Sequence, residues 1–356
     1  MQPLSLHFLH EQAGARFQDV QGREVVADYG DEPAEYRAAR EGVVLHDATY
    51  REALRITGED RTSFLHGMVT QDVKGLAPGA SAYTALITVK GAMVADARIL
   101  RRDADLVLDL EPGLGGKVRE FLEKFLISED AELHDASGDG GWLRLLGPRT
   151  PELLGAALGA PFAPLAPDTT RAVALAGQDV VLLGAPRLHP QGVDVWVPRA
   201  GLEPVWKALL AAGAGLGVRP LGWRALEALR VEAGVPRYGQ DMVDTTIPLE
   251  ANLTHGISYN KGCYIGQEVI ARATFRGHMN RKLAGLRLGT AGSAVPGMEL
   301  KKDGKKVGWV TSVVRTPGTD QHLALGYVHR DHLEPGTALT VGEGPAEATV
   351  AALPFA

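Results

Sequence analysis

Short apolar segments separated by glycine and proline recur along this 356-residue chain, and they limit the folds it can adopt. The 43 glycines and 21 prolines are scattered between periodic segments, which implies many short loops rather than disorder. No apolar run reaches the roughly 18 residues that a transmembrane helix needs. Alternating apolar runs, typical of strands, are interspersed with helical patterns. The sequence therefore predicts an α+β protein of two or three domains.

The order of these segments divides the chain into four parts. Repeated strand–helix–strand order over residues 136–255 fits a ferredoxin-like layer, which we assign together with residues 1–50 to one discontinuous domain. Residues 51–135 are expected to form a compact α+β unit. Residues 256–282 hold a cysteine motif and a basic linker, and residues 283–356 alternate short β segments with glycine turns. We therefore predict a separate β domain at the C-terminal end.

Charge and cysteine content exclude several classes of function. A net charge of −6 argues against a general nucleic-acid coat, though not against a local basic site. The single cysteine, Cys263, excludes an intrachain disulfide and cannot alone supply the usual four ligands of an iron–sulfur cluster. His329 and His332 have a spacing that could hold a metal, but no further ligand accompanies them, so we expect no metal site. No signal peptide is recognisable, and we expect a cytoplasmic protein.

Residues 260–269 surround the cysteine with features that favour a reactive thiol. Cys263 follows Lys261 and lies between Gly262 and Gly266, which suggests a tight backbone path that a Cβ would obstruct. A helical pattern begins at Gly266, so the thiol would lie just before a helix N-terminus, where unpaired N–H groups favour an anion. With Lys261 nearby, the thiolate should form more readily than in an ordinary cysteine. A small buried hydrophobe is the alternative interpretation.

The amino-acid sequence of this motif resembles that of a known family. Lys-Gly-Cys-Tyr-Ile-Gly-Gln-Glu at residues 261–268, followed by Val-Ile-Ala-Arg-Ala-Thr-Phe-Arg-Gly, is similar to the signature of the YgfZ-type folate-binding proteins. These are relatives of the T-protein, the aminomethyltransferase of the glycine cleavage system. Residues 60–73 and 307–312 are further segments whose sequences are similar to those of the family. The resemblance implies a three-domain T-protein-like architecture with a C-terminal β-barrel. It also implies tetrahydrofolate or a derivative as cofactor, bound by the discontinuous domain.

The resemblance also marks an aspartate on a predicted hairpin. In T-proteins the equivalent turn carries paired aspartates, one of which is essential for transferring the aminomethyl group to folate. The matching phrase here, residues 91–98, has Ala95 in place of one partner and keeps Asp96. Asp96 is therefore expected to contact the pterin, and a solvated hairpin carboxylate is the alternative. The incomplete pair weighs against true aminomethyltransferase activity and leaves open whether the chain is an enzyme.

Further folate contacts are implied by residues 223–253 and by the cysteine motif. In the folate enzymes, the glutamate that matches Glu232 holds the amide and amino groups of the pterin. A carboxylate suits that task because it accepts two parallel N–H bonds. Tyr238 would supply ring stacking or a hydroxyl, and Gln267 is expected to contact the cofactor from within the motif. A helix-end surface glutamate and a core-edge tyrosine are the alternative interpretations.

The densest positive cluster of the chain follows the cysteine motif. Its members are Arg272, Arg276, His278, Arg281 and Lys282. Because Glu268 and Arg272 are four residues apart on the predicted helix, we expect an ion pair between them. The cluster is either a solvated linker face or an anion-binding rim. As a rim, it would suit the glutamate tail of a folate or an RNA backbone.

The resemblance implies a tetrahydrofolate-binding protein that supports assembly or repair of iron–sulfur proteins, with enzymes of tRNA methylthiolation among its clients. Two alternatives stay open: a folate-dependent aminomethyl or demethylating transferase, and a non-catalytic tRNA- or protein-binding module. Weak tRNA contact is possible, and no membrane partner is expected. Cys263 and Lys261 are the expected catalytic residues. The expected folate contacts are Glu232, Tyr238, Asp96, Arg272 and Gln267.

Overall fold

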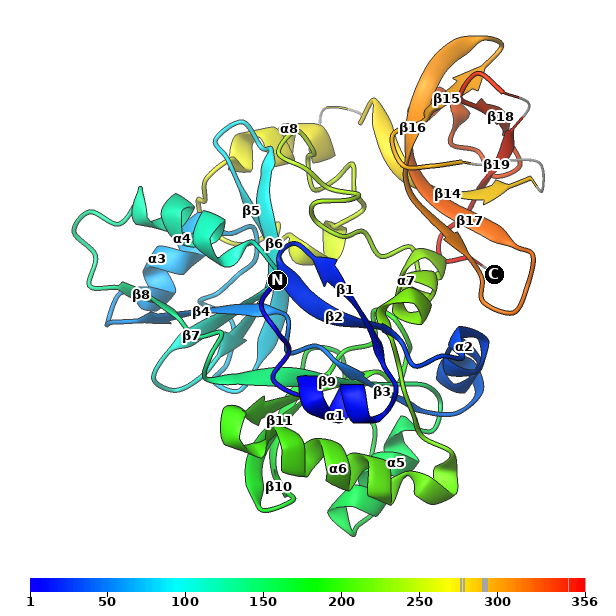
Figure 1. The fold of residues 1–356 in the computed structure, drawn as a ribbon. Coiled ribbons are helices and arrows are strands. Elements are labelled where there is room, and N and C mark those ends of the chain that lie inside the picture. Colours follow the sequence, from blue (N-terminus) through cyan, green and yellow to red (C-terminus); the bar gives the residue numbers. More distant parts are fainter. Residues whose placement is uncertain (276, 278, 290–293, 345, 356) are drawn as a thin grey trace.

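The computed structural model describes residues 1–275, 277, 279–289, 294–344 and 346–355. Over these residues the chain forms a six-stranded sheet, a five-stranded sheet, a two-stranded sheet and a closed barrel. Figure 1 shows the two large sheets side by side, with the barrel set apart at one end. The predicted α+β class and the C-terminal β-barrel are both confirmed. No helix in the described part of the chain combines the length and apolar character that crossing a bilayer requires.

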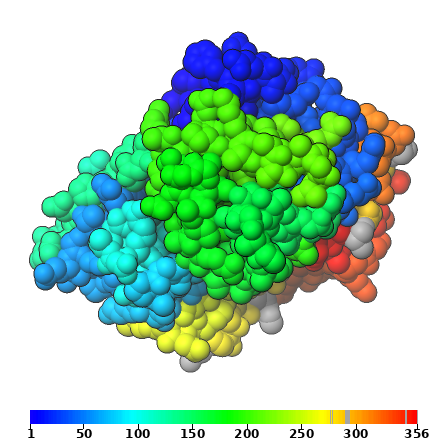
Figure 2. All heavy atoms as spheres, turned by 90° about the horizontal axis from the view of Figure 1, so that it is seen from below, coloured from blue at the N-terminus to red at the C-terminus, as the bar shows by residue number. Residues whose placement is uncertain are grey.

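The six-stranded sheet is built from the N-terminal part of the chain and from residues beyond 140. Its strand order is β10-β11-β12-β9-β3-β13. Helices α5 (Thr150–Leu158) and α6 (Leu202–Ala212) cover one face and enclose an apolar core. In Figure 2 the green atoms of this helical layer occupy the centre of the view. The strands are β3 (Val44–Asp47), β9 (Gly140–Leu146), β10 (Thr170–Leu175), β11 (Gln178–Gly184), β12 (Val193–Pro198) and β13 (Arg219–Pro220).

The two faces of this sheet have different chemistry because side chains alternate along each strand. On β9, Leu143 and Leu145 point into the helix-covered core, whereas Trp142 and Arg144 belong to the other face. Helix α5 begins with a proline in its first turn and ends at Gly159, whose φ of 69° is left-handed. These signals fix where α5 begins and ends, and the apolar core holds it on one face of the sheet.

The five-stranded sheet is contiguous in sequence, from residue 52 to residue 135. Its strand order is β5-β6-β7-β4-β8. Helices α3 (Arg61–Met68) and α4 (Gly115–Glu123) contribute Phe64, Leu65, Val118 and Leu122 to the apolar core on one face. The strands are β4 (Glu52–Thr57), β5 (Ser81–Ile87), β6 (Met93–Arg101), β7 (Leu106–Leu110) and β8 (Glu132–Asp135).

Helix α7 (Trp223–Glu232) joins the sheets to the barrel (Figure 1). It packs against α2 (Glu32–Glu41), β2 and the barrel strands β16 and β17. The N-terminal segment adds a helix and a two-stranded sheet: α1 (His7–Gln12), β1 (Arg16–Val20) and β2 (Arg23–Asp28).

The barrel closes in the order β14-β17-β16-β15-β18-β19. Val231 of α7 packs with Leu325 and Tyr327 of the barrel, so the two share a core. Helix α8 (Gln267–Phe275) lies between the five-stranded sheet and the barrel in Figure 1. The barrel strands are β14 (Arg281–Leu288), β15 (Glu299–Lys302), β16 (Lys305–Arg315), β17 (His322–His329), β18 (Ala338–Val341) and β19 (Glu347–Ala351).

Candidate functional site

A charged pocket lies where the two large sheets face each other. Each sheet supplies a pair of directly opposed residues: Arg98 and Asp109 from β6 and β7, and Arg144 and Asp194 from β9 and β12. Helix α7 and residues 235–237 complete the lining. The space not filled by atoms is about 710 Å³, counting the open mouth. The part of this space that the centre of a water-sized sphere can occupy is about 80 Å³.

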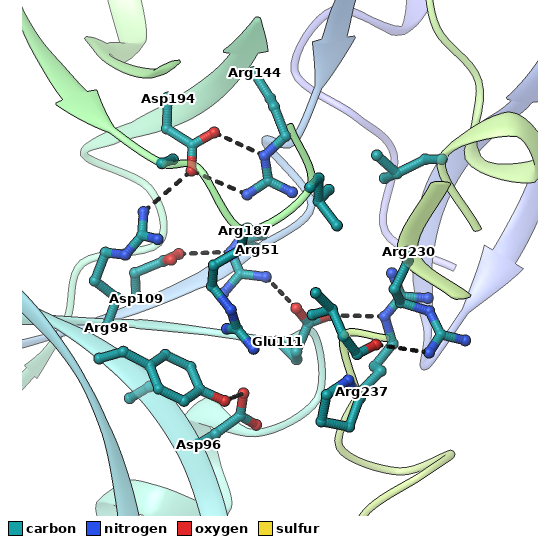
Figure 3. Close-up of a pocket in the computed structure, with 17 residues that line it drawn as sticks. Arg51, Asp96, Arg98, Asp109, Glu111, Arg144, Arg187, Asp194, Arg230 and Arg237 are labelled. Atoms are coloured by element: carbon teal, nitrogen blue, oxygen red, sulfur yellow. Dashed lines mark hydrogen bonds and ion pairs between the residues drawn. The ribbon is translucent and has the colours of Figure 1, made fainter. Parts of the chain in front are cut away.

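Ion pairs organise the walls of this pocket (Figure 3). Asp194 accepts hydrogen bonds from Arg144 at 2.7 and 3.0 Å and from Arg98 at 3.3 Å. Arg51 donates to Asp109 at 2.8 Å and also to Glu111. The lining holds six arginines and four carboxylates, but Arg230 and Arg237 also pair with Glu227 and Asp241 outside it. Arg187 has no carboxylate partner among the described residues. The pocket is therefore suited to a ligand with negative charge.

Asp96 is the carboxylate that this network leaves available. It is buried on β6, and Oδ2 accepts a hydrogen bond of 2.6 Å from the Tyr83 hydroxyl. Its other oxygen, Oδ1, is buried and has no hydrogen-bond partner in the described part of the chain. Burial raises the pKa of Asp96 more than the Tyr83 hydrogen bond and the nearby Arg187 lower it. Arg187 lies over the Tyr83 ring at 4.1 Å. Asp96 can thus hold or release a proton inside the pocket.

The neighbouring Ala95 has a different environment. It is fully buried and belongs to the apolar core beneath α3 and α4. Adjacent residues on a strand point to opposite faces, so a carboxylate at position 95 would not lie beside Asp96. In this protein, therefore, the alanine at position 95 does not deprive the pocket of a carboxylate.

The cysteine motif lies outside this pocket. Cys263 is exposed, so the buried-hydrophobe alternative does not hold. Gly266 has a φ of 79°, and a Cβ there would come within 2.5 Å of the Thr88 carbonyl oxygen, as the expected tight path requires. A Cβ at Gly262 would meet only His66 Nε2, at an ordinary contact distance of 4.0 Å, so that expectation was wrong there. Helix α8 begins at Gln267, just beyond Gly266.

Lys261 makes contacts that its spacing in the sequence did not indicate, and its role beside the thiol stays a prediction. Its ammonium is buried and donates to the carbonyl oxygens of Val69 at 2.7 Å and Gln71 at 2.8 Å, and also to that of His66. These carbonyls lie at and beyond the C-terminal end of α3, where a cation is favoured. Burial lowers the pKa of Lys261 to about 8. The side chain therefore ties the cysteine loop to α3.

We expect Lys261→Met to lower the free energy of unfolding by about 1–3 kcal/mol, because buried carbonyls lose a charged donor. Chemical denaturation followed by circular dichroism measures the change. The matched variant Cys263→Ala should leave the denaturation midpoint unchanged, because the thiol is exposed. A Lys261→Met protein as stable as the wild type would contradict this structural role.

The remaining predicted folate contacts are dispersed. Glu232 accepts from the Tyr36 hydroxyl at 2.6 Å and lies 3.7 Å from Arg40, so it does not line the pocket. The Tyr238 hydroxyl donates to Asp244, and it accepts a hydrogen bond of 2.6 Å from Lys117. Tyr238 lines a separate cavity.

The predicted folate contacts around α8 also lie away from the charged pocket. Gln267 is half-buried at the start of α8, and Arg272 is exposed. The expected Glu268–Arg272 ion pair is not formed among the described residues, so that prediction was wrong. Arg276 and His278 of the basic cluster lie outside the described residues. Within the described part of the chain, no group of three or more metal-binding side chains is found.

Sequence reasoning missed most of the pocket. The missed residues are Arg51, Arg98, Asp109, Glu111, Arg144, Arg187, Asp194, Arg230 and Arg237. A signal existed: Asp109, Arg144 and Asp194 each interrupt an apolar strand, where a charged side chain needs a partner.

The acid stability of the protein should depend on Glu111. Burial would raise its pKa, but the charges of Arg51 and Arg237 outweigh burial and lower that pKa from 4.5 to about 2. A carboxyl with a depressed pKa stabilises the folded state above its unfolded pKa, and this contribution is lost as the pH falls. We therefore expect a loss of stability between about pH 4.5 and 2. Urea denaturation across this range should show that the free energy of unfolding of Glu111→Gln falls less steeply with decreasing pH than that of the wild type. Equal slopes would refute the role of Glu111 in acid stability.

Comparison with known proteins gives consistent matches along the chain. The model of the GCVT N-terminal domain matches residues 6–261, and that of the glycine cleavage T-protein C-terminal barrel domain matches residues 281–356. An aminomethyltransferase of Pelodictyon phaeoclathratiforme is 28% identical over 96% of this chain and 94% of its own length. One from Saccharopolyspora erythraea is 29% identical over 98% and 96%. The crystal structure of glycine cleavage system aminomethyltransferase T from Bartonella henselae has a TM-score of 0.88 at 25% identity, covering 100% of this chain and 98% of that one.

Proposed function

The chain belongs to the glycine cleavage T-protein family, and on that basis we propose that it binds a reduced folate in the charged pocket and transfers a one-carbon unit there. Aminomethyltransferases of this family use tetrahydrofolate. The observation that carries the proposal is Asp96, a buried carboxylate with one unpartnered oxygen inside a pocket rich in guanidinium groups. The relatives named aminomethyltransferase support the transferase reading more strongly than the iron–sulfur one.

The residues present fit a folate. A pterin presents ring and exocyclic N–H donors, and Asp96 Oδ1 is a buried acceptor without a partner. The glutamate tail carries two carboxylates, which guanidinium groups bind through paired hydrogen bonds. Arg187 has no carboxylate partner in the described part of the chain, and Arg98 Nε has no hydrogen-bond partner there. These two arginines are the best candidates to meet an anionic or carbonyl group.

As the bond between the transferred carbon and the folate nitrogen forms, the bond from that carbon to its donor breaks and the donor's leaving group takes the electron pair. The folate nitrogen must then lose its proton. Asp96 is placed to accept that proton, and its raised pKa makes it a stronger base than an exposed aspartate. The Tyr83 hydrogen bond fixes its orientation. Burial of the pair excludes bulk water and strengthens every electrostatic interaction in the pocket. The chain thus supplies a base and an anion-binding lining.

Calorimetric titration with 5-formyltetrahydrofolate, a stable reduced folate, tests the binding step. We expect one molecule bound per chain, weaker binding by Asp96→Asn, and unchanged binding by Glu232→Gln, because Glu232 does not line the pocket. Folded Asp96→Asn protein, checked by circular dichroism, serves as the control. If Glu232→Gln loses binding while Asp96→Asn keeps it, the folate lies elsewhere and the proposal fails.

The exposed thiol favours a second candidate function. Cys263 faces solvent and does not line the charged pocket, so its chemistry would involve an external partner. This placement suits a YgfZ-type role in assembly or repair of cytoplasmic iron–sulfur enzymes, including those of tRNA methylthiolation. Weak contact of tRNA with the exposed Arg272 stays a prediction.

Complementation of a cell that lacks its own copy tests the second function. Wild type and Cys263→Ala should be compared at equal protein levels, with iron–sulfur enzyme activity and tRNA methylthio content as readouts. Rescue by the wild type alone would support a thiol-dependent role. Equal rescue by both would exclude the thiol, and rescue by neither would exclude the function.

A further inference from the structure

A second pocket lies beside the charged pocket, and we call it the side pocket. Arg187, Val235 and Pro236 line both cavities, so the two share a wall. The space not filled by atoms in the side pocket is about 530 Å³, counting its open mouth. The centre of a water-sized sphere can occupy about 240 Å³ there, against about 80 Å³ in the charged pocket. The side pocket therefore has room for a small molecule that also reaches the charged pocket.

The lining of the side pocket has one charge. Arg187 supplies it, beside the polar side chains of Asn252 and His255, and no acidic residue lines the pocket in the described part of the chain. Partial burial and the charges of Arg187 and Arg98 lower the pKa of His255 to about 4, so this imidazole is neutral at neutral pH. The apolar part of the lining consists of Ala233, Val235, Pro236, Ala251 and Leu253. Apolar walls with a single positive charge favour a ligand with one negative group.

The guanidinium of Arg187 is held in place without being neutralised. It lies over the Tyr83 ring at 4.1 Å, and His255 stacks on the same ring at 4.8 Å. The loop that carries Arg187 is closed by a hydrogen bond of 2.8 Å from the Ala185 amide to the Gly192 carbonyl. Among the described residues, Arg187 has no carboxylate partner. A half-buried arginine in this state can bind a carboxylate of a ligand through two parallel hydrogen bonds.

Tyr83 connects this arginine to Asp96. The Tyr83 ring contacts Arg187, and its hydroxyl donates to Asp96 Oδ2 at 2.6 Å. Burial raises the pKa of Asp96, and the charge of Arg187 opposes that rise, so the two groups are close enough to interact. A molecule that reaches from Asp96 to Arg187 therefore has to span little more than one tyrosine side chain. An extended folate tail is longer, because an aminobenzoyl ring and an amide separate the pterin from the glutamate carboxylates.

We propose that Arg187 binds the carboxylate of the one-carbon donor, and that this donor is a small zwitterionic amino acid with a cationic nitrogen. The inference rests on the proposed function, which places the base Asp96 beside the carbon in transfer. With its carboxylate on Arg187, the donor directs its nitrogen toward Asp96, whose negative charge favours a cation. The apolar walls of the side pocket suit the carbon groups attached to that nitrogen.

The transfer step balances with such a donor. The cationic nitrogen releases the carbon and keeps the electron pair of the broken bond, so it becomes neutral. The carbon forms its new bond to the folate nitrogen, and the proton of that nitrogen passes to Asp96. No oxidant or reductant is needed. Arg187 contributes by binding the donor and thereby determines specificity.

Calorimetric titration of the full chain with N,N-dimethylglycine tests the carboxylate contact, with and without 5-formyltetrahydrofolate. We expect Arg187→Met to weaken N,N-dimethylglycine binding by about tenfold or more. N,N-dimethylglycinamide, which lacks the carboxylate, should bind the wild type more weakly than N,N-dimethylglycine. Arg171→Met is the matched control: it removes an exposed arginine that lies over the Phe162 ring, outside both pockets, and should bind like the wild type. Circular dichroism confirms that both variants fold.

The results separate this inference from the proposed function. If the wild type binds 5-formyltetrahydrofolate, but N,N-dimethylglycine binds to neither protein or equally to wild type and Arg187→Met, the donor inference fails and the folate proposal stands. If Arg187→Met loses affinity for 5-formyltetrahydrofolate and keeps it for 5-formyltetrahydropteroate, which lacks the glutamate, Arg187 binds the folate tail and the inference is overturned. If N,N-dimethylglycine binds through Arg187 while no folate binds, the proposed function fails and the donor role with it.

Discussion

Asparagine in place of Asp96 is expected to lower the rate of folate-dependent one-carbon transfer by about 10²-fold or more while the protein stays folded. The amide keeps the size of the side chain and can still accept from the Tyr83 hydroxyl. It cannot take up a proton, which is the role that the buried, unpartnered oxygen suggests. Single-turnover assays with tetrahydrofolate and an aminomethyl donor measure the rate.

A variant of Tyr83, which positions Asp96, shows whether Asp96 acts by proton transfer or only by packing. Tyr83→Phe removes the hydrogen bond that lowers the pKa of Asp96, so the acidic limb of the pH–rate profile should move to higher pH. Asp103→Asn, on an exposed turn outside the charged pocket, should behave like the wild type. Full activity of Asp96→Asn would eliminate Asp96 as the base, and an unmoved profile for Tyr83→Phe would eliminate the proposed tuning.

Replacing Arg230 with methionine is expected to lower the free energy of unfolding by about 3–5 kcal/mol. Arg230 Nη1 donates to Asp241 Oδ2 at 2.6 Å, and its Nη2 donates to Ser312 of the barrel at 2.9 Å. Asp241 is 2% exposed, and its other oxygen accepts from Thr311 and Ser312. Loss of the guanidinium leaves a buried carboxylate with reduced compensation, at the junction between α7 and the barrel. Equilibrium denaturation measures the effect.

Two further variants show whether the unpaired charge is the cause. Arg230→Met combined with Asp241→Asn should be less destabilised than Arg230→Met alone, because the buried charge is gone. Arg315→Met, which breaks an exposed pair with Asp320, should match the wild type within error. If the double variant is no more stable than Arg230→Met alone, packing rather than charge explains the loss.

Local patterns predicted local structure well. The helix after Gly266, the tight backbone path at Gly266 and the C-terminal barrel are all confirmed, because each depends on periodicity, glycine placement or a recognisable sequence motif. Lys261 shows where such reasoning ends. Its partners lie at residues 66–71, about 190 positions earlier in the chain, and nothing near Lys261 in sequence indicates them.

How the charged residues of the pocket come together could not be predicted for the same reason, although Asp109, Arg144 and Asp194 stand out in their strands. The wall of the pocket is formed when β9 and β12 present Arg144 and Asp194 opposite the Arg98 face of the other sheet, and this depends on how two sheets meet. Glu232 illustrates the converse. The family resemblance implied a pterin contact for it, and the packing of α2 against α7 brings the Tyr36 hydroxyl to it. The pterin contact stays a prediction.

The position of β3 within the six-stranded sheet has a consequence for biosynthesis. β3 (Val44–Asp47) is paired on one side with β9 and on the other with β13, which ends at Pro220. At translation rates of about 5–20 residues per second, a strand made early waits roughly 10 to 35 s for its last neighbour. The five-stranded sheet, contiguous from residue 52 to residue 135, is complete long before then. On the ribosome, the inserted unit should therefore fold first and the sheet that frames it should close around a finished neighbour.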